Sequence, residues 1–126
     1  MKNFLSINDI TNLPDLVQSA LNFKSAPLAS ERIGKGKTLG LIFMNPSLRT
    51  RLSSQKAAYN LGMNVIVMNM SQDSWQLEFE DGTVMNGGTA EHVKEAAAVI
   101  SQYCDIIGIR TFAGLTDRAF DYQEVI

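Results

Sequence analysis

Short apolar runs alternate with segments of helical periodicity along this chain, and this alternation limits the folds that it can adopt. The apolar runs cover 38–44, 64–70 and 105–110. Between them, apolar residues recur every three to four positions, which is the spacing of one helix face. Strands that alternate with helices are typical of βαβ units, in which crossover helices join parallel strands. The pattern predicts an α/β fold, a three-layer parallel sheet with helices on both faces.

Turn and cap residues mark the ends of the first two expected helices. The first covers 12–24, where the side chain of Asn12 can cap the N-terminus and Pro14 fits the first turn. The second covers 48–61. It is expected to end at Gly62, because glycine readily adopts the left-handed conformation that follows many helices.

The third helix is expected to follow a long polar loop. The loop covers 71–88, and Thr89 can cap a helix over 90–102. All three expected strands are continuously apolar rather than alternating, which indicates burial on both faces of the sheet. Apolar residues at helical spacing begin again at 122–126, so the chain is expected to stop part-way through a further crossover.

Composition and charge argue against several classes of protein. The 126 residues correspond to one domain or a piece of one. The chain has 11 Lys and Arg against 13 Asp and Glu, whereas nucleic-acid binders usually present a basic face. The longest apolar runs, such as 96–100, are far shorter than the ~20 residues that cross a bilayer. A single cysteine, Cys104, allows no internal disulfide, and the first residues do not resemble a cleavable leader. We expect a cytoplasmic protein with neither nucleic acid nor membrane as a partner.

Two residue types that often carry chemistry are expected to serve structure here. Cys104 stands at the entrance to an apolar strand, and free cysteine is among the most buried residue types. His92 is the sole histidine, which gives little basis for a multi-histidine metal site or a catalytic triad. We expect it to be structural or solvated.

Polar side chains gather after the first and third expected strands. Ligands of parallel sheets bind outside the carboxyl ends of the strands. There the segment 45–51 begins a helix, whose free N–H groups favour an anion. Ser47 and Thr50 add hydroxyl groups, Arg49 adds a planar donor fork suited to phosphate, and Arg110 could polarise a carbonyl group. The alternative interpretation is an ordinary helix cap with solvated arginines.

The sequence FMNPSLRTR at 43–51 resembles the Ser-x-Arg-Thr carbamoyl phosphate signature of the aspartate/ornithine carbamoyltransferases. Further matches are Phe23-Lys24 and the strand at 105–110. Similarity is closest to the N-acylornithine branch, because Asn45 and Leu48 stand where other members usually carry a charged residue and a threonine. The long loop also contains a tryptophan, as it does in that branch.

The resemblance implies transfer of a carbamoyl group from carbamoyl phosphate to the δ-amine of an N-acylornithine, for arginine biosynthesis. Ser47, Leu48, Arg49 and Thr50 would bind the phosphate. Arg110 and Thr50 would polarise the carbamoyl carbonyl as its oxygen gains charge. No metal or organic cofactor is implied.

The resemblance also implies partners beyond this chain. Trp75 would bind carbamoyl phosphate in the neighbouring subunit's site, which makes a homotrimer the active unit. Residues 1–126 would form an incomplete carbamoyl phosphate-binding domain, truncated before its fourth strand. The second, amino-acid-binding domain would lie outside it. The chain alone is therefore expected to be inactive.

Ala90 bears on the acyl group of the acceptor. The acetyl-preferring branch typically has glutamate at the corresponding position and the succinyl-preferring branch proline, so Ala90 matches neither. A glutamate there would repel the carboxylate of a succinyl group, and alanine removes that repulsion. We expect N-succinylornithine to be preferred over N-acetylornithine. An ornithine carbamoyltransferase, a non-catalytic anion-binding module and an interaction protein remain as alternatives.

Overall fold

The computed structural model describes residues 4–70, 76–84, 88–89 and 91–112. Within these ranges no helix has the length and hydropathy needed to span a bilayer. The apolar residues at 122–126 lie outside the described residues, as does part of the loop expected at 71–88. The elements in chain order are a 3-10 helix at Ile7–Asp9, α1 (Leu13–Ser25), β1 (Thr38–Phe43), α2 (Leu48–Asn60), β2 (Asn64–Asn69), β3 (Leu77–Glu78), β4 (Glu91–His92), α3 (Val93–Tyr103) and β5 (Ile106–Arg110).

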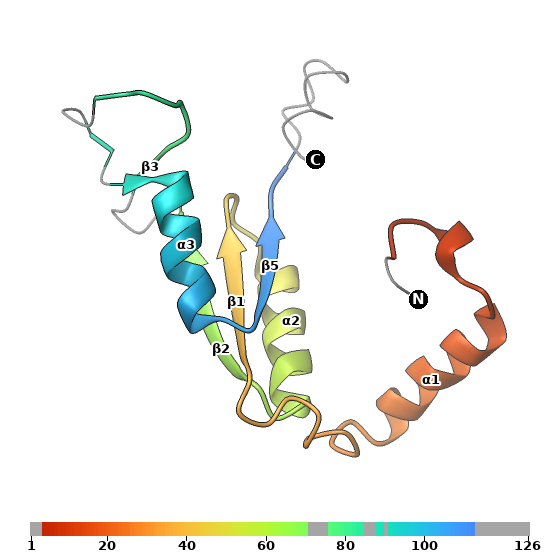
Figure 1. Cartoon of the computed structure of the whole chain (residues 1–126). Coiled ribbons are helices and arrows are strands. Elements are labelled where there is room, and N and C mark those ends of the chain that lie inside the picture. The colour runs from red at the N-terminus through yellow and green to blue at the C-terminus, as the bar shows by residue number, and fades with distance from the viewer. Residues whose placement is uncertain (1–3, 71–75, 85–87, 90, 113–126) are drawn as a thin grey trace.

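Three parallel strands form the main sheet in the order β2-β1-β5, with β1 at its centre. The chain moves from β1 to β2 in one direction and then crosses back past β1 to reach β5. Because such crossovers are right-handed, the two moves place their helices on opposite faces of the sheet. Figure 1 shows the sheet between α2 and α3. The predicted α/β fold with helices on both faces is confirmed.

Local chemistry explains where α1 and α2 begin and end. The side chain of Asn12 accepts a hydrogen bond from the backbone N–H of Asp15 at 3.2 Å, and Pro14 lies in the first turn of α1. Gly62, directly after the C-cap residue of α2, has a φ of 78°, the left-handed conformation that L-residues avoid. Both helices therefore start and stop within two residues of the predicted positions.

The predicted start of the third helix is wrong by three residues. We expected Thr89 to cap a helix from 90, whereas α3 begins at Val93 with His92 as its N-cap. The imidazole Nδ1 of His92 accepts the backbone N–H of Lys94 at 3.1 Å. The residues before α3 are held extended because β4 pairs with β3, a two-residue strand inside the segment that we expected to be loop. This tertiary pairing overrides the local cap preference.

The core is concentrated on the central strand. Leu41, Ile42 and Phe43 of β1 are buried, together with Ala58 of α2 and Ala96 of α3. The prediction that every strand is buried on both faces is wrong for β2 and β5, in which no residue is buried and in which Ile66 and Ile109 are 42% and 66% exposed. These are the two edge strands, so their side chains have neighbours on one side only, whereas the side chains of β1 are flanked on both sides.

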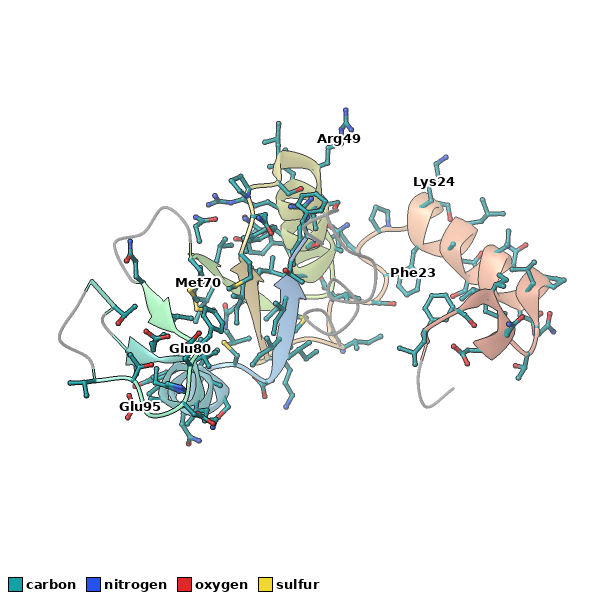
Figure 2. All side chains as sticks on the ribbon, turned by 90° about the horizontal axis from the view of Figure 1, so that it is seen from above. Phe23, Lys24, Arg49, Met70, Glu80 and Glu95 are labelled. Carbon is teal, nitrogen blue, oxygen red and sulfur yellow. The ribbon has the colours of Figure 1, made fainter. Side chains whose placement is uncertain are left out.

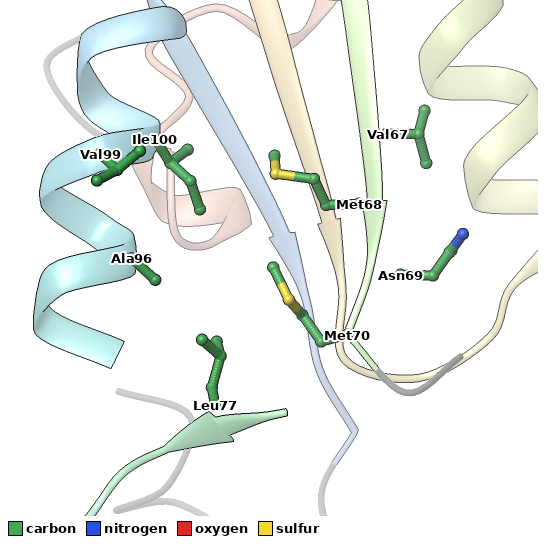
Figure 3. Close-up of a pocket in the computed structure, with 8 residues that line it drawn as sticks. All are labelled: Val67, Met68, Asn69, Met70, Leu77, Ala96, Val99 and Ile100. Carbon is green, nitrogen blue, oxygen red and sulfur yellow. The ribbon is translucent and has the colours of Figure 1, made fainter. Parts of the chain in front are cut away.

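The space between the sheet and α3 is loosely filled. Figure 3 shows Met68 and Met70 pointing from β2 and its end toward α3, across an apolar cavity of about 260 Å³. A second hollow of about 680 Å³ extends from there toward the ends of β1 and β5. The cavity is lined mainly by aliphatic and methionine side chains, as expected of an incompletely covered sheet face. Its residues are Val67, Met68, Asn69, Met70, Leu77, Ala96, Val99 and Ile100.

An ion pair joins the start of β1 to the start of β5. Lys37 Nζ lies 2.9 Å from Asp105 Oδ1, and Asp105 Oδ2 accepts the backbone N–H of Thr38 at 2.8 Å. The Lys37 ammonium and the Thr38 N–H hold the pKa of the Asp105 carboxyl below its usual value. These contacts align the start of β5 with the start of β1. The same register places Arg110 opposite Phe43 at the carboxyl ends of the two strands.

Replacing Gly62 with alanine is expected to destabilise the chain by more than about 2 kcal/mol, since a left-handed alanine alone costs about 1–2 kcal/mol. An added Cβ would also collide with the backbone carbonyl of Glu31. Gly36→Ala is the matched control, because Gly36 has a φ of 77° but no described atom within 4 Å of the added carbon. Urea unfolding of the three proteins measures both effects, and equal losses for the two variants would contradict the expected collision.

Candidate functional site

The junction between β1 and α2 presents the start of a helix at the carboxyl edge of the sheet. Ser47 is the N-cap of α2, and its Oγ accepts the backbone N–H of Thr50 at 3.4 Å. The N–H groups of Leu48 and Arg49 belong to the first turn, where helix geometry supplies no acceptor within the helix. Both side chains are exposed. The junction therefore offers outward N–H groups, two hydroxyl groups and a cation together.

Arg110 joins the second predicted segment to the first. It is the last residue of β5 and lies opposite Phe43 in the parallel register. Its Nη1 donates to the backbone carbonyls of Asn45 at 3.1 Å and Pro46 at 3.0 Å. The sheet register thus brings Arg110 against the β1–α2 junction, although the two are about 65 residues apart in sequence.

Phe112 and Asn45 also lie beside Arg110, and we assigned neither of them a role from the sequence. The guanidinium carbon lies 4.1 Å from the centroid of the Phe112 ring, within the range of a cation–π interaction. The backbone N–H of Phe112 donates to Asn45 Oδ1 at 2.9 Å. An asparagine directly after a strand is a weak signal for such a tie, and the sequence does not indicate which distant N–H it accepts.

Two cations and a helix N-terminus lie at the junction between β1 and α2. Arg49 projects outward from the first turn of α2 (Figure 2), and Arg110 is half-buried at the strand end. A helix N-terminus carries about +0.5 of an elementary charge, which adds to these two cations. The arrangement can bind a small dianion through charge-assisted hydrogen bonds and can polarise a carbonyl group beside it. Trp75 and Ala90, the other predicted site residues, lie outside the described residues.

The remaining candidates for reactivity have structural surroundings. Cys104 is the C-cap of α3 and is half-buried rather than fully buried. Its partial burial, followed by the nearby charge of Asp105, raises the pKa of its thiol. A raised pKa keeps the thiol protonated, the less nucleophilic form. Among the described residues, no three His, Cys, Asp or Glu side chains gather as they would around a metal ion.

His92 links the cap of α3 to the loop before it. With Nδ1 accepting a hydrogen bond, its buried Nε2 faces Asp81 Oδ1 at 3.5 Å. Asp81 also accepts a hydrogen bond from Lys94 Nζ at 2.7 Å, which lowers the pKa of its carboxyl. Of the two expectations for this histidine, structural or solvated, these contacts agree with the structural one.

Comparison with known proteins gives one consistent result. The sequence profile of the aspartate/ornithine carbamoyltransferase carbamoyl-P binding domain matches residues 2–125. The chain is 49% identical to the N-succinylornithine carbamoyltransferase of Bacteroides thetaiotaomicron, over all of this chain and 40% of that protein. It is 40% identical to the N-acetylornithine carbamoyltransferase of Xylella fastidiosa, over all of this chain and 38% of that protein. The chain therefore spans about two-fifths of the length of these relatives.

Solved structures agree with the sequence comparison. Crystal structures of an N-acetyl-L-ornithine transcarbamylase superpose with a TM-score of 0.77 at 40% identity, covering 98% of this chain and 37% of theirs. One of them is complexed with acetylcitrulline. Variants of that protein with one glutamate replaced by serine, valine, alanine or proline are complexed with carbamyl phosphate and N-succinyl-L-norvaline.

Proposed function

Because this chain belongs to the aspartate/ornithine carbamoyltransferase family, we propose that it is the carbamoyl phosphate-binding half of an N-acylornithine carbamoyltransferase. The observation that carries this proposal is the contact between Arg110 Nη1 and the carbonyls of Asn45 and Pro46. It joins a helix N-terminus suited to phosphate with a cation suited to a carbonyl oxygen. Carbamoyl phosphate contains both groups within one small molecule.

Each residue of the site has a proposed task. The N–H groups at the start of α2, the Ser47 hydroxyl and the Arg49 guanidinium bind the phosphate oxygens. Arg110 and the Thr50 hydroxyl donate to the carbamoyl oxygen, on which negative charge grows in the transition state. The acceptor's δ-amine attacks the carbamoyl carbon, so a C–N bond forms and the C–O bond to phosphate breaks. The amine loses a proton as phosphate leaves.

The acceptor is proposed to be held largely by a second domain. We call this chain joined to that acceptor-binding domain the complete enzyme. The product, an N-acylcitrulline, fits a role in arginine biosynthesis. Trp75 is proposed to reach into the neighbouring subunit's site within a homotrimer. These proposals rest on the family to which the chain belongs. Trp75 itself lies outside the described residues.

N-succinylornithine is the proposed acceptor, and the position of Ala90 is the reason. We propose that Ala90 occupies the place of the glutamate that was replaced in the relative's N-succinyl-L-norvaline complexes. Alanine, serine, valine and proline share the absence of charge at that point. A neutral side chain spares the succinyl carboxylate a like-charge neighbour in a partly dry pocket.

We expect the complete enzyme to use N-succinylornithine with the highest kcat/KM, N-acetylornithine less well and free ornithine least. Ala90→Glu should move the succinyl-to-acetyl ratio of kcat/KM toward acetyl by about tenfold or more, because the added carboxylate repels the succinyl carboxylate. The measurement is product formation with each of the three acceptors. Ala90→Gln is the control, since it adds a side chain of nearly the same size without charge.

Different outcomes would contradict different parts of the proposal. Equal shifts for the glutamate and glutamine variants would assign the effect to volume rather than charge. Preference for free ornithine would support the alternative of an ornithine carbamoyltransferase. Carbamoyl phosphate binding with no transfer to any acceptor would support a non-catalytic anion-binding module.

A further inference from the structure

We propose that Asn45 is a positioning residue that holds Arg110 in the orientation needed to polarise the carbamoyl carbonyl, an inference that rests on the proposed function. Asn45 contacts the surroundings of Arg110 in two ways. Its backbone carbonyl accepts a hydrogen bond from Arg110 Nη1 at 3.1 Å. Its side-chain Oδ1 accepts the backbone N–H of Phe112 at 2.9 Å, two residues beyond the arginine.

The tie to Phe112 matters because burial does not hold that residue in place. The Phe112 side chain is 62% exposed, yet its ring centroid lies 4.1 Å from the guanidinium carbon of Arg110. The hydrogen bond to Asn45 Oδ1 fixes the backbone from which the ring projects. Asn45 therefore acts on the guanidinium through the ring, as well as through its own carbonyl.

The geometry leaves Arg110 able to bind a ligand. A guanidinium has five N–H donors, and within the described part of the chain its hydrogen bonds, to the carbonyls of Asn45 and Pro46, engage Nη1. The Nε and Nη2 groups remain on the other edges of the same plane. Two hydrogen bonds and one ring face thus fix the plane before a ligand arrives. Such preorganisation removes a reorganisation cost from the reaction step, so its loss should lower kcat more than it raises KM.

The charge of the side chain at position 45 and its acceptor oxygen should affect different kinetic constants. An aspartate retains an oxygen that can accept the Phe112 N–H, but it adds a negative charge beside the phosphate site. Asn45→Asp should therefore keep kcat near that of the unmodified enzyme while raising the KM for carbamoyl phosphate. Asn45→Ala removes the acceptor without adding charge and should have the opposite pattern.

The test is steady-state kinetics of the complete enzyme with both substrates varied. We expect Asn45→Ala to lower kcat about tenfold with less than a threefold change in the KM for carbamoyl phosphate. The loss should be smaller when Phe112→Leu is already present, because the leucine variant lacks the ring that Asn45 positions. Asn64→Ala is the matched control, since Asn64 is exposed at the start of β2, at the opposite end of the sheet.

The inference is overturned if the unmodified enzyme is active and Asn45→Ala keeps its kcat, or if Asn45→Ala and Phe112→Leu lower kcat independently. It is also overturned if Asn45→Asp loses kcat as fully as Asn45→Ala, because the acceptor oxygen would then be irrelevant. Absence of carbamoyl transfer by the unmodified enzyme would instead overturn the proposed function, and this inference with it. Thermal melting of each variant separates loss of kcat from loss of folded protein.

Discussion

The 126-residue chain, purified alone, is expected to transfer no carbamoyl group to N-succinylornithine or N-acetylornithine. In the proposed function this chain binds carbamoyl phosphate, while binding of the acceptor requires a second domain. The chain spans 40% of its Bacteroides thetaiotaomicron relative. Holding two reactants in the correct geometry is worth about 7–11 kcal/mol of the barrier, a rate factor of roughly 10⁵–10⁸. A site that binds only one reactant forgoes this factor. The measurement is ureido product formed by a sample whose mass has been verified.

The complete enzyme is the control for this experiment, assayed at equal concentration of sites. Its activity would show that the isolated chain is inactive because it lacks the acceptor-binding domain, and not because residues 1–126 are defective. Transfer by the isolated chain above the uncatalysed rate would contradict the division of the site between two domains.

Arg49→Ala is expected to weaken carbamoyl phosphate binding to the complete enzyme by a hundredfold or more. Hydrogen bonds to charged groups contribute about 1.5–3 kcal/mol each, and a guanidinium fork can make two to one phosphate. Arg49 lies in the first turn of α2 with an exposed side chain, so it can reach an anion at the helix N-terminus without moving the backbone. Isothermal titration calorimetry with carbamoyl phosphate measures the loss.

Arg51→Ala provides the matched control for the Arg49 experiment. Both arginines are exposed and lie within the first turns of α2, but two positions on a helix are about 200° apart around its axis. Removal of Arg51 should therefore reduce affinity only through the weaker, salt-screened effect of net charge. Equal losses from the two substitutions would show that the site attracts its anion through general positive charge and not through the fork of Arg49.

Much of the fold could be predicted because its local signals agree with its tertiary arrangement. The run at 38–44 forms a buried strand because it is continuously apolar, and Gly62 ends α2 because its left-handed φ suits glycine. The third helix was less predictable. Thr89 is a better local cap than His92, and the pairing of β3 with β4 overrides that preference. Pairing between two short, separate segments produces no periodic pattern of apolar residues in the sequence of either one.

The two halves of the candidate site could be predicted to different extents. Ser47, Leu48, Arg49 and Thr50 are consecutive, so the sequence places them together at the start of a helix. Arg110 could be assigned to the same edge because parallel strands end on the same side of their sheet. Its contacts with Asn45 and Phe112 could not, since they depend on the register Phe43↔Arg110 and on side-chain geometry.

The sequence by itself determined the alternation of strands and helices, the cap residues of α1 and α2, and the family to which the chain belongs. These depend on residues close together in the chain, where spacing and conformational preference act directly. Only the tertiary structure decided that Asn45 spans from the first strand end to Phe112, 67 residues away. A hydrogen bond needs its two atoms within about 3 Å, and for distant residues only the packed sheet sets that separation.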